Sequence, residues 1–133
     1  LSLDGRKEIH DASRMTVSGE GSYDLIVPKF QKFVEQRQGR GYYMRGTFTH
    51  ANPDFLEDIK VMLDLGFNEL SMEPVVCAPG DPAELTEEDM DKYRLDRKAL
   101  DYDSTETRRA LPAMAPRIRF RSWKWSSGDI RFL

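Results

Sequence analysis

The chain has 133 residues, enough for one domain with a hydrophobic core and too few to make two domains the expectation. Charged residues make up 32% of it and the formal net charge is −3, a balance that argues against wholesale nucleic-acid binding and against disorder. No apolar run reaches the roughly 18 residues of a membrane-spanning helix, and no signal-peptide pattern is present, so a cytoplasmic location is the default expectation. The single cysteine, Cys77, excludes an internal disulfide and cannot by itself build a zinc site or an iron–sulfur cluster.

The first third of the sequence predicts a strand followed by a helix. Residues 1–4 resemble the end of a buried strand, and Asp4 and Gly5 stand where that strand would end. After a polar, glycine-bearing segment over 6–21, apolar residues recur at helical spacing and predict an amphipathic helix with Ser22 as its N-cap. The apolar stripe of this helix consists of Ile26, Val27, Phe30, Phe33 and Val34.

Two further strands and a second helix follow. Residues 42–49 are rich in aromatic and β-branched side chains, which predicts a strand. Asn52 and Pro53 have the form of an N-cap and a first helical residue, and Gly66 ends the predicted helix. The apolar face of that helix would consist of Phe55, Ile59, Met62 and Leu63. A third strand is expected over 68–73.

The alternation of strands and helices predicts a parallel βαβαβ unit, because links this short between helix and strand are typical of parallel sheets. The fold class is therefore α/β, either about half of a TIM-like barrel or part of an open doubly wound sheet. The segment Thr86–Asp89 has the form of a capping box with Asp in place of Glu or Gln, so another helix should begin there. From about Asp103 a loosely attached tail is expected, because Pro112 and Pro116 interrupt it and its many arginines are costly to bury.

The functional residues of a parallel α/β fold lie beyond the carboxyl ends of the strands, where loops and helix N-termini converge. This rule selects Ser2, Asp4, Gly5, Thr49, His50, Asn52, Glu73, Val75, Val76 and Cys77, and it predicts that Ser2, Asp4, Thr49 and Glu73 share one rim of the sheet. Structural alternatives exist for several of them: Asp4-Gly5 also fits a simple turn, and His50 also fits a hydrogen bond within its loop. Glu73 must find a partner once it is buried. Cys77 has the character of a small buried hydrophobe, since no activating histidine is near it in the sequence.

The stretch SLDGRKEIHDASR resembles a segment of radical S-adenosylmethionine (SAM) enzymes of the SPASM type, in which a strand ends in Ser-x-Asp-Gly and an arginine follows about ten residues later. Three longer stretches, YDLIVPKFQKFVE, YYMRGTFTHANPDF and FNELSMEPVVCAPGDP, are similar to one subgroup, the maturases that form thioether crosslinks in six-cysteine (SCIFF) peptides. The resemblance covers about 1–93 and implies the C-terminal half of a partial (β/α)6 TIM-like barrel. Residues 94–133 would be a helix continuation and an atypical basic tail.

The resemblance also implies a chemistry and a set of contacts. In that family a 4Fe-4S cluster binds the methionine part of SAM, and a 5′-deoxyadenosyl radical takes a hydrogen from a cysteine-rich precursor peptide. Carried over by motif, Ser2 and Arg14 would contact the carboxylate of SAM, and Val76 would lie against its adenine. Asp4 joins these cofactor contacts by its position at the strand end. The resemblance assigns no catalytic residue and no metal ligand in this chain.

Two features of the family are not found in this sequence. These are the CxxxCxxC loop that holds the cluster and the cysteine-rich C-terminal domain. Without three thiolates there is no cluster. The chain is therefore expected to be a segment of a radical SAM enzyme that is inactive alone.

Two other classes of function remain open. A non-enzymatic binding module for nucleic acid or an acidic peptide is suggested by the basic and aromatic tail, although a basic edge strand or an unfolded tail explains it as well, and nucleic acid is not the expected partner. The residues concerned are Arg117, Ile118, Arg119, Phe120, Arg121, Trp123, Lys124 and Trp125. A hydrolase would use Asp4, Glu73 and His50 as acid, base or metal ligands, but no HxxxH or comparable spacing supports it.

Overall fold

The computed structural model describes the backbone of residues 1–110, 117–120, 125–126 and 129–130, and the side chains of residues 1–99. The helices of this part are α1 (Lys7–Ser13), α2 (Tyr23–Gln36), α3 (Phe55–Asp64) and α4 (Glu87–Ala110). Its strands are β1 (Met44–Phe48), β2 (Glu69–Pro74), β3 (Arg117–Phe120), β4 (Trp125–Ser126) and β5 (Asp129–Ile130). The chain is thus a mixed α/β protein, as predicted.

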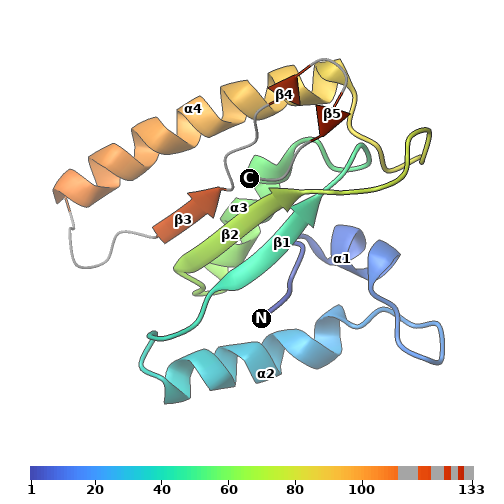
Figure 1. The fold of residues 1–133 in the computed structure, drawn as a ribbon. Coiled ribbons are helices and arrows are strands. Elements are labelled where there is room, and N and C mark those ends of the chain that lie inside the picture. Colours follow the sequence, from blue (N-terminus) through green and yellow to red (C-terminus); the bar gives the residue numbers. More distant parts are fainter. Residues whose placement is uncertain (111–116, 121–124, 127–128, 131–133) are drawn as a thin grey trace.

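The central sheet is parallel and has the order β1-β2-β3 (Figure 1). The predicted parallel pairing of the strands near 42–49 and 68–73 is confirmed, with Thr47 opposite Glu73 in the register. The predicted first strand is reduced to a single parallel bridge between Ser2 and Arg45 on the other side of β1. In this bridge the Leu3 N–H donates to the carbonyl of Arg45 at 2.9 Å.

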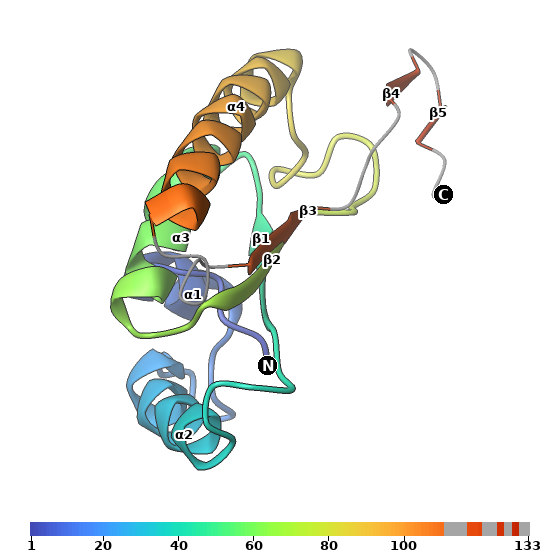
Figure 2. The same cartoon turned by 90° about the vertical axis from the view of Figure 1, so that its left-hand side faces the viewer.

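The four helices lie on one side of this sheet (Figure 2). The core fills the space between the sheet and the helices, and its largest buried side chains include Leu3, Met44, Phe48, Phe55, Ile59, Met62, Phe67, Leu70 and Met72. Phe48 is at the centre, with its ring 4.9 Å from that of Phe55 on α3 and 5.3 Å from that of Tyr93 on α4. Burial of each of these side chains stabilises the fold by about 1.5–3 kcal/mol. The helices therefore cover one face of the sheet. The loops that follow the strands lie at its carboxyl-terminal end.

Helix α1 was not predicted, because the segment 6–21 has no apolar stripe and only His10 of this helix is buried. Hydrogen bonds to its neighbours hold it instead. One of them joins α1 to α2, where the carboxylate of Asp11 accepts the backbone N–H of Tyr23 at 2.8 Å. Ser22 precedes α2 as predicted, but its hydroxyl donates to the carbonyl of Arg14 at 2.7 Å and caps nothing. A short helix held by polar contacts leaves little periodic signal in a sequence.

Two details of the predicted helices are wrong. Asn52 is not the N-cap of α3, since that helix begins at Phe55 and Asp54 holds the cap position. Phe33, expected in the core, is 38% exposed and lies against the guanidinium of Arg37, 5.3 Å from the ring centre. Val27 and Val34 are the residues of this stripe that are buried, while Ile26 and Phe30 are only partly buried against the core.

The tail differs in part from its prediction. The backbone continues in α4 to Ala110, and residues 117–120 form β3, which pairs in parallel with β2. This segment is an edge strand of the sheet and not a loose extension. Trp123 lies outside the described residues, as does the side chain of Trp125, so the expected loose attachment of the tail is not tested at these residues.

The predicted capping box begins α4. The Asp89 carboxylate accepts the backbone N–H of Thr86 at 2.7 Å, and the Thr86 hydroxyl in turn accepts the Asp89 N–H at 3.2 Å. Asp89→Ala is therefore expected to lower the free energy of unfolding by about 1 kcal/mol. Asp91→Ala serves as the control, because it removes only the exposed ion pair with Arg94 and should cost about 0.5 kcal/mol or less. Equal losses in urea unfolding would contradict the capping role.

Candidate functional site

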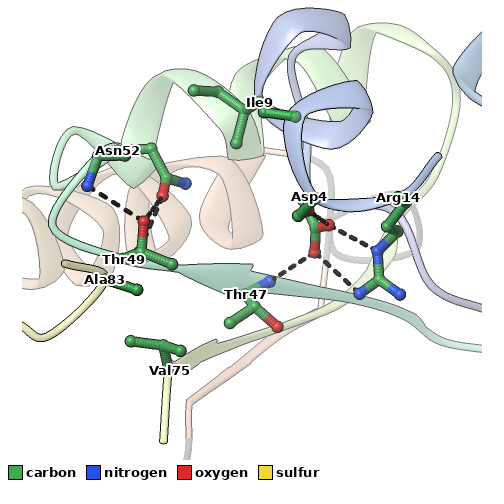
Figure 3. Close-up of a pocket in the computed structure, with 11 residues that line it drawn as sticks. Asp4, Ile9, Arg14, Thr47, Thr49, Asn52, Val75 and Ala83 are labelled. Atoms are coloured by element: carbon green, nitrogen blue, oxygen red, sulfur yellow. Dashed lines mark hydrogen bonds and ion pairs between the residues drawn. The ribbon is translucent and has the colours of Figure 1, made fainter. Parts of the chain in front are cut away.

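An open pocket of about 480 Å³ lies at the carboxyl-terminal end of the sheet (Figure 3). Its walls come from the loop after residues 1–3, from α1, from the end of β1 and from the loops after β1 and β2. The lining residues are Asp4, Ile9, Ala12, Ser13, Arg14, Thr47, Thr49, Ala51, Asn52, Val75 and Ala83. The pocket therefore has small apolar walls, several hydroxyl groups and one ion pair.

Asp4 organises this end of the sheet. Its side chain is buried, and its Oδ1 accepts the backbone N–H of Thr47 on β1 at 3.0 Å. The same carboxylate takes two bonds from Arg14, Nε to Oδ2 at 2.6 Å and Nη2 to Oδ1 at 3.2 Å. This paired geometry is the strong form of a charged hydrogen bond. Asp4 is thus more than a turn residue, since it ties the first strand end to β1 and fixes the guanidinium of Arg14.

Arg14 follows the C-terminal end of α1 and forms part of the pocket wall. Its hydrogen bonds to Asp4 raise the pKa of its guanidinium, so the group stays charged. The side chain is 39% exposed, and Nη1 makes no hydrogen bond within the part of the chain that the structure describes. Both N–H groups of Nη1 and the second N–H of Nη2 therefore remain for a ligand that enters the pocket.

The two residues after Asp4 pack against α3. Gly5 has a positive φ of 104°, and a Cβ at this position would lie 2.2 Å from the Cβ of Asp58. Arg6 then bonds to two carboxylates of α3 and its N-terminus: its Nε donates to Asp58 at 2.8 Å and its Nη2 to Asp54 at 2.7 Å. Asp-Gly-Arg is therefore one structural unit that seats the pocket loop on α3.

Asn52 and Thr49 form a second polar group in the lining of the pocket. Asn52 is buried, and its side-chain oxygen accepts the backbone N–H of Thr49 at 2.8 Å and the Thr49 hydroxyl at 3.0 Å. Its amide nitrogen donates to Asp58 at 3.1 Å. The buried carboxylate of Asp58 thus links the loop after β1 to the loop after the first strand end.

Three of the four residues expected at one rim of the sheet lie there, and Ser2 lies further back along the sheet. Asp4 and Thr49 line the pocket, while Glu73 stands opposite Thr47 in the register, at the same rim as Asp4. Ser2 is exposed and pairs with Arg45, which precedes Thr47 on β1. Val76 is 55% exposed, and its neighbour Val75 lines the pocket in its place. The cofactor contacts of Ser2 and Val76 therefore stay predictions, and the structure adds Val75 as a wall of the pocket.

The three residues weighed as hydrolase groups each have a structural partner. The ring of His50 lies 2.7 Å from the Asp89 carboxylate, and its backbone N–H donates to Ala83, as the loop interpretation predicted. Burial opposes the ionisation of Asp89, but hydrogen bonds from Thr86 and His50 outweigh it and lower its pKa. Glu73 accepts a hydrogen bond from Arg45 at 2.5 Å, which satisfies its predicted need for a partner.

Cys77 is only partly buried, which corrects its prediction as a small buried hydrophobe. Desolvation, with Asp81 and Glu84 nearby, raises the pKa of the Cys77 thiol, so it carries no activated thiolate. Among the described side chains, no group of three or more His, Cys, Asp or Glu could hold a metal ion. No helix of residues 1–110 has the length and apolarity that a membrane crossing requires.

Several site residues were not found from the sequence. Ser13 and Thr47 line the pocket because a short helix and a strand register place them there, and neither has a local motif. Arg14 was selected only through the resemblance, although its partner Asp4 was selected from the strand end. No family model matches the chain, and no curated protein matches its sequence.

Proposed function

We propose that the chain is a segment of a radical SAM peptide maturase of the SPASM type, and that its pocket takes SAM. One observation carries the proposal. The aspartate of the Ser-x-Asp-Gly motif and the arginine ten residues later meet as a bidentate pair on the wall of a pocket. They do so at the carboxyl-terminal end of a parallel sheet, where α/β enzymes bind their ligands.

The arrangement of the helices supports the finer proposal that residues 1–93 are half of a partial (β/α)6 barrel. In a barrel the helices cover only the outer face of the sheet, whereas an open doubly wound sheet has helices on both faces. Here α1, α2, α3 and α4 share one side (Figure 2). Of the two architectures that the sequence left open, the barrel fits this arrangement better.

The residues of the pocket fit SAM in kind. The free Nη1 of Arg14 suits a carboxylate, the hydroxyls of Thr47 and Thr49 suit a ribose, and Val75 with Ala83 offers an apolar wall. The 4Fe-4S cluster does not fit this chain, because Cys77 is its single cysteine. SAM supplies the radical in that family when it is bound to the cluster. A role in catalysis therefore requires three thiolates from outside this chain, and the precursor peptide is proposed only as the substrate of the whole enzyme.

A binding measurement tests the pocket. SAM is titrated by calorimetry into the purified chain, into Arg14→Ala and into the control Arg40→Ala, which changes an exposed arginine after α2. We expect saturable binding that Arg14→Ala weakens about tenfold or more, because a charged hydrogen bond contributes about 1.5–3 kcal/mol. Circular dichroism establishes that both variants are folded. No heat of binding, or equal affinities for the two variants, would remove SAM from the proposal.

A second measurement tests the statement that the chain is a segment. Reconstitution with iron, sulfide and SAM is expected to give neither cluster absorbance nor 5′-deoxyadenosine; a clear yield of either would overturn it. An in-frame CxxxCxxC in the coding sequence upstream of Leu1 would support the family assignment directly.

The alternative is a binding module that uses the basic and aromatic tail. Its residues 121–124 lie outside the described part, and the backbone of 117–120 forms an edge strand, which favours the basic edge strand over a nucleic-acid surface. Oligonucleotide binding that weakens steeply with rising salt would support the module, and no binding at low salt would remove it.

A further inference from the structure

His10 lies directly behind the Asp4–Arg14 pair and is fully buried. Its Nδ1 accepts the backbone N–H of Asp4 at 3.3 Å, so in this arrangement Nδ1 carries no proton. The ring is therefore neutral with its proton on Nε2, which donates to the Ser22 hydroxyl at 3.0 Å. The Ser22 hydroxyl in turn donates a hydrogen bond to the carbonyl of Arg14 at 2.7 Å. One tautomer thus satisfies the whole chain of bonds, from Asp4 through His10 and Ser22 to Arg14.

A proton on Nδ1 would change this arrangement at one atom. The Nδ1 of His10 is 3.8 Å from Oδ2 of Asp4, and that same oxygen is the one that accepts Nε of Arg14 at 2.6 Å. A protonated His10 could no longer accept the Asp4 N–H, and it would become a charged donor facing Oδ2. Two cations would then compete for one carboxylate oxygen.

The geometry points to His10 as a proton-dependent positioning residue for Arg14, acting through Asp4. When His10 is neutral, Asp4 holds Arg14 against the pocket wall. When His10 is protonated, Oδ2 of Asp4 turns to the imidazolium and Nε of Arg14 is released. The released guanidinium can then present its Nε–H as well to an anion in the pocket.

Every packed element contributes a group that faces His10. Asp4 comes from the first strand end, Asp11 and Arg14 from α1 and its end, and Tyr23 from α2 with its ring centre 5.9 Å away at an edge-on angle. Burial lowers the pKa of His10 below its ordinary 6.5, Arg14 adds to this, and the two carboxylates oppose it. The midpoint of His10 protonation in the folded protein therefore lies below pH 6.5, and Arg14 stays held at neutral pH.

The change of partner at Oδ2 of Asp4 needs no ligand. Only its consequence for SAM rests on the proposed function: the affinity of the pocket for the SAM carboxylate would rise as His10 becomes protonated. The test therefore follows the side chains alone. Nuclear magnetic resonance records the His10 ring signal and the Arg14 Nε–H signal between pH 7.5 and 5. Arg14→Lys assigns the arginine signal, and His50→Gln removes the only other histidine of the chain.

We expect the two signals to titrate with the same midpoint, unchanged in His50→Gln. His10→Gln is the matched variant, since its amide can accept from Asp4 and donate to Ser22 but does not titrate. Relative to this variant at the same pH, protection of the Arg14 Nε–H against exchange should fall about tenfold or more, as expected for loss of a charged hydrogen bond. An unchanged Arg14 signal while His10 titrates would overturn the inference, and so would a His10 that stays neutral until the protein unfolds. The wild-type midpoints decide this even if His10→Gln does not fold.

Discussion

Gly5→Ala is expected to lower the free energy of unfolding by about 3 kcal/mol or more. The residue has a φ of +104°, where a side chain costs about 1–2 kcal/mol. In addition, its Cβ would lie 2.2 Å from the Cβ of Asp58 and 2.6 Å from its Cα. Relief of that overlap requires α3 to move, which costs about 1–3 kcal/mol more.

Gly66→Ala is the matched control. It has a similar φ of +91°, but nothing lies within 4 Å of the added Cβ. We therefore expect it to cost only the conformational part, about 1–2 kcal/mol. Urea unfolding of both variants measures the difference, and equal losses would show that the loop and α3 are not in contact at Gly5.

Asp58→Ala has the second largest expected effect, a loss of about 3 kcal/mol, because it breaks a buried ion pair from one side. Asp58 is fully buried, and it accepts bonds from Arg6 and from the amide of Asn52. Without it, the Arg6 guanidinium keeps only Asp54 as a partner, and the buried amide nitrogen of Asn52 loses its acceptor. The midpoint of chemical unfolding should shift with an unchanged slope.

Asp54→Ala tests whether the loss of stability depends on the burial of the carboxylate or only on its ion pair with Arg6. Asp54 also bonds to Arg6 with two oxygens, but its side chain is 40% exposed and water can replace it. Its removal should cost about 1 kcal/mol or less. A larger loss for Asp54→Ala than for Asp58→Ala would contradict the assignment of Asp58 as the anchor of the pocket loop.

The roles of Asp4, Gly5 and Arg6 bear on the proposed function. Each of the three has a structural partner, so the motif is explained in part by the way the first strand end is seated on α3 and β1. The N–H groups of Arg14 that Asp4 does not use, those of Nη1 among them, have no such structural role and lie at the pocket wall. Comparison of Arg14→Ala with Gly5→Ala therefore separates ligand binding from folding: the first should weaken SAM more than stability, and the second should do the reverse.

The sequence by itself determined the helices and strands between residues 22 and 89, and their order. The aromatic and β-branched run became β1, the glycine with φ +91° ended α3, and Thr86 with Asp89 formed the capping box. The parallel pairing of β1 with β2 was also predicted. The helix between them returns the chain to the end of the sheet where β1 begins, so β2 runs in the same direction. These features depend on neighbours a few residues apart, which a single sequence displays.

Only the tertiary structure decided how the pocket is built. Arg6 meets Asp58 across 52 positions of the chain, and Asp4 meets the backbone of Thr47 across 43. Arg14 reaches Asp4 because α1, a helix without an apolar stripe, turns the chain back between them. Such contacts leave no periodic signal, since the partner of a buried charge is chosen by the packing of distant elements and not by the residues beside it.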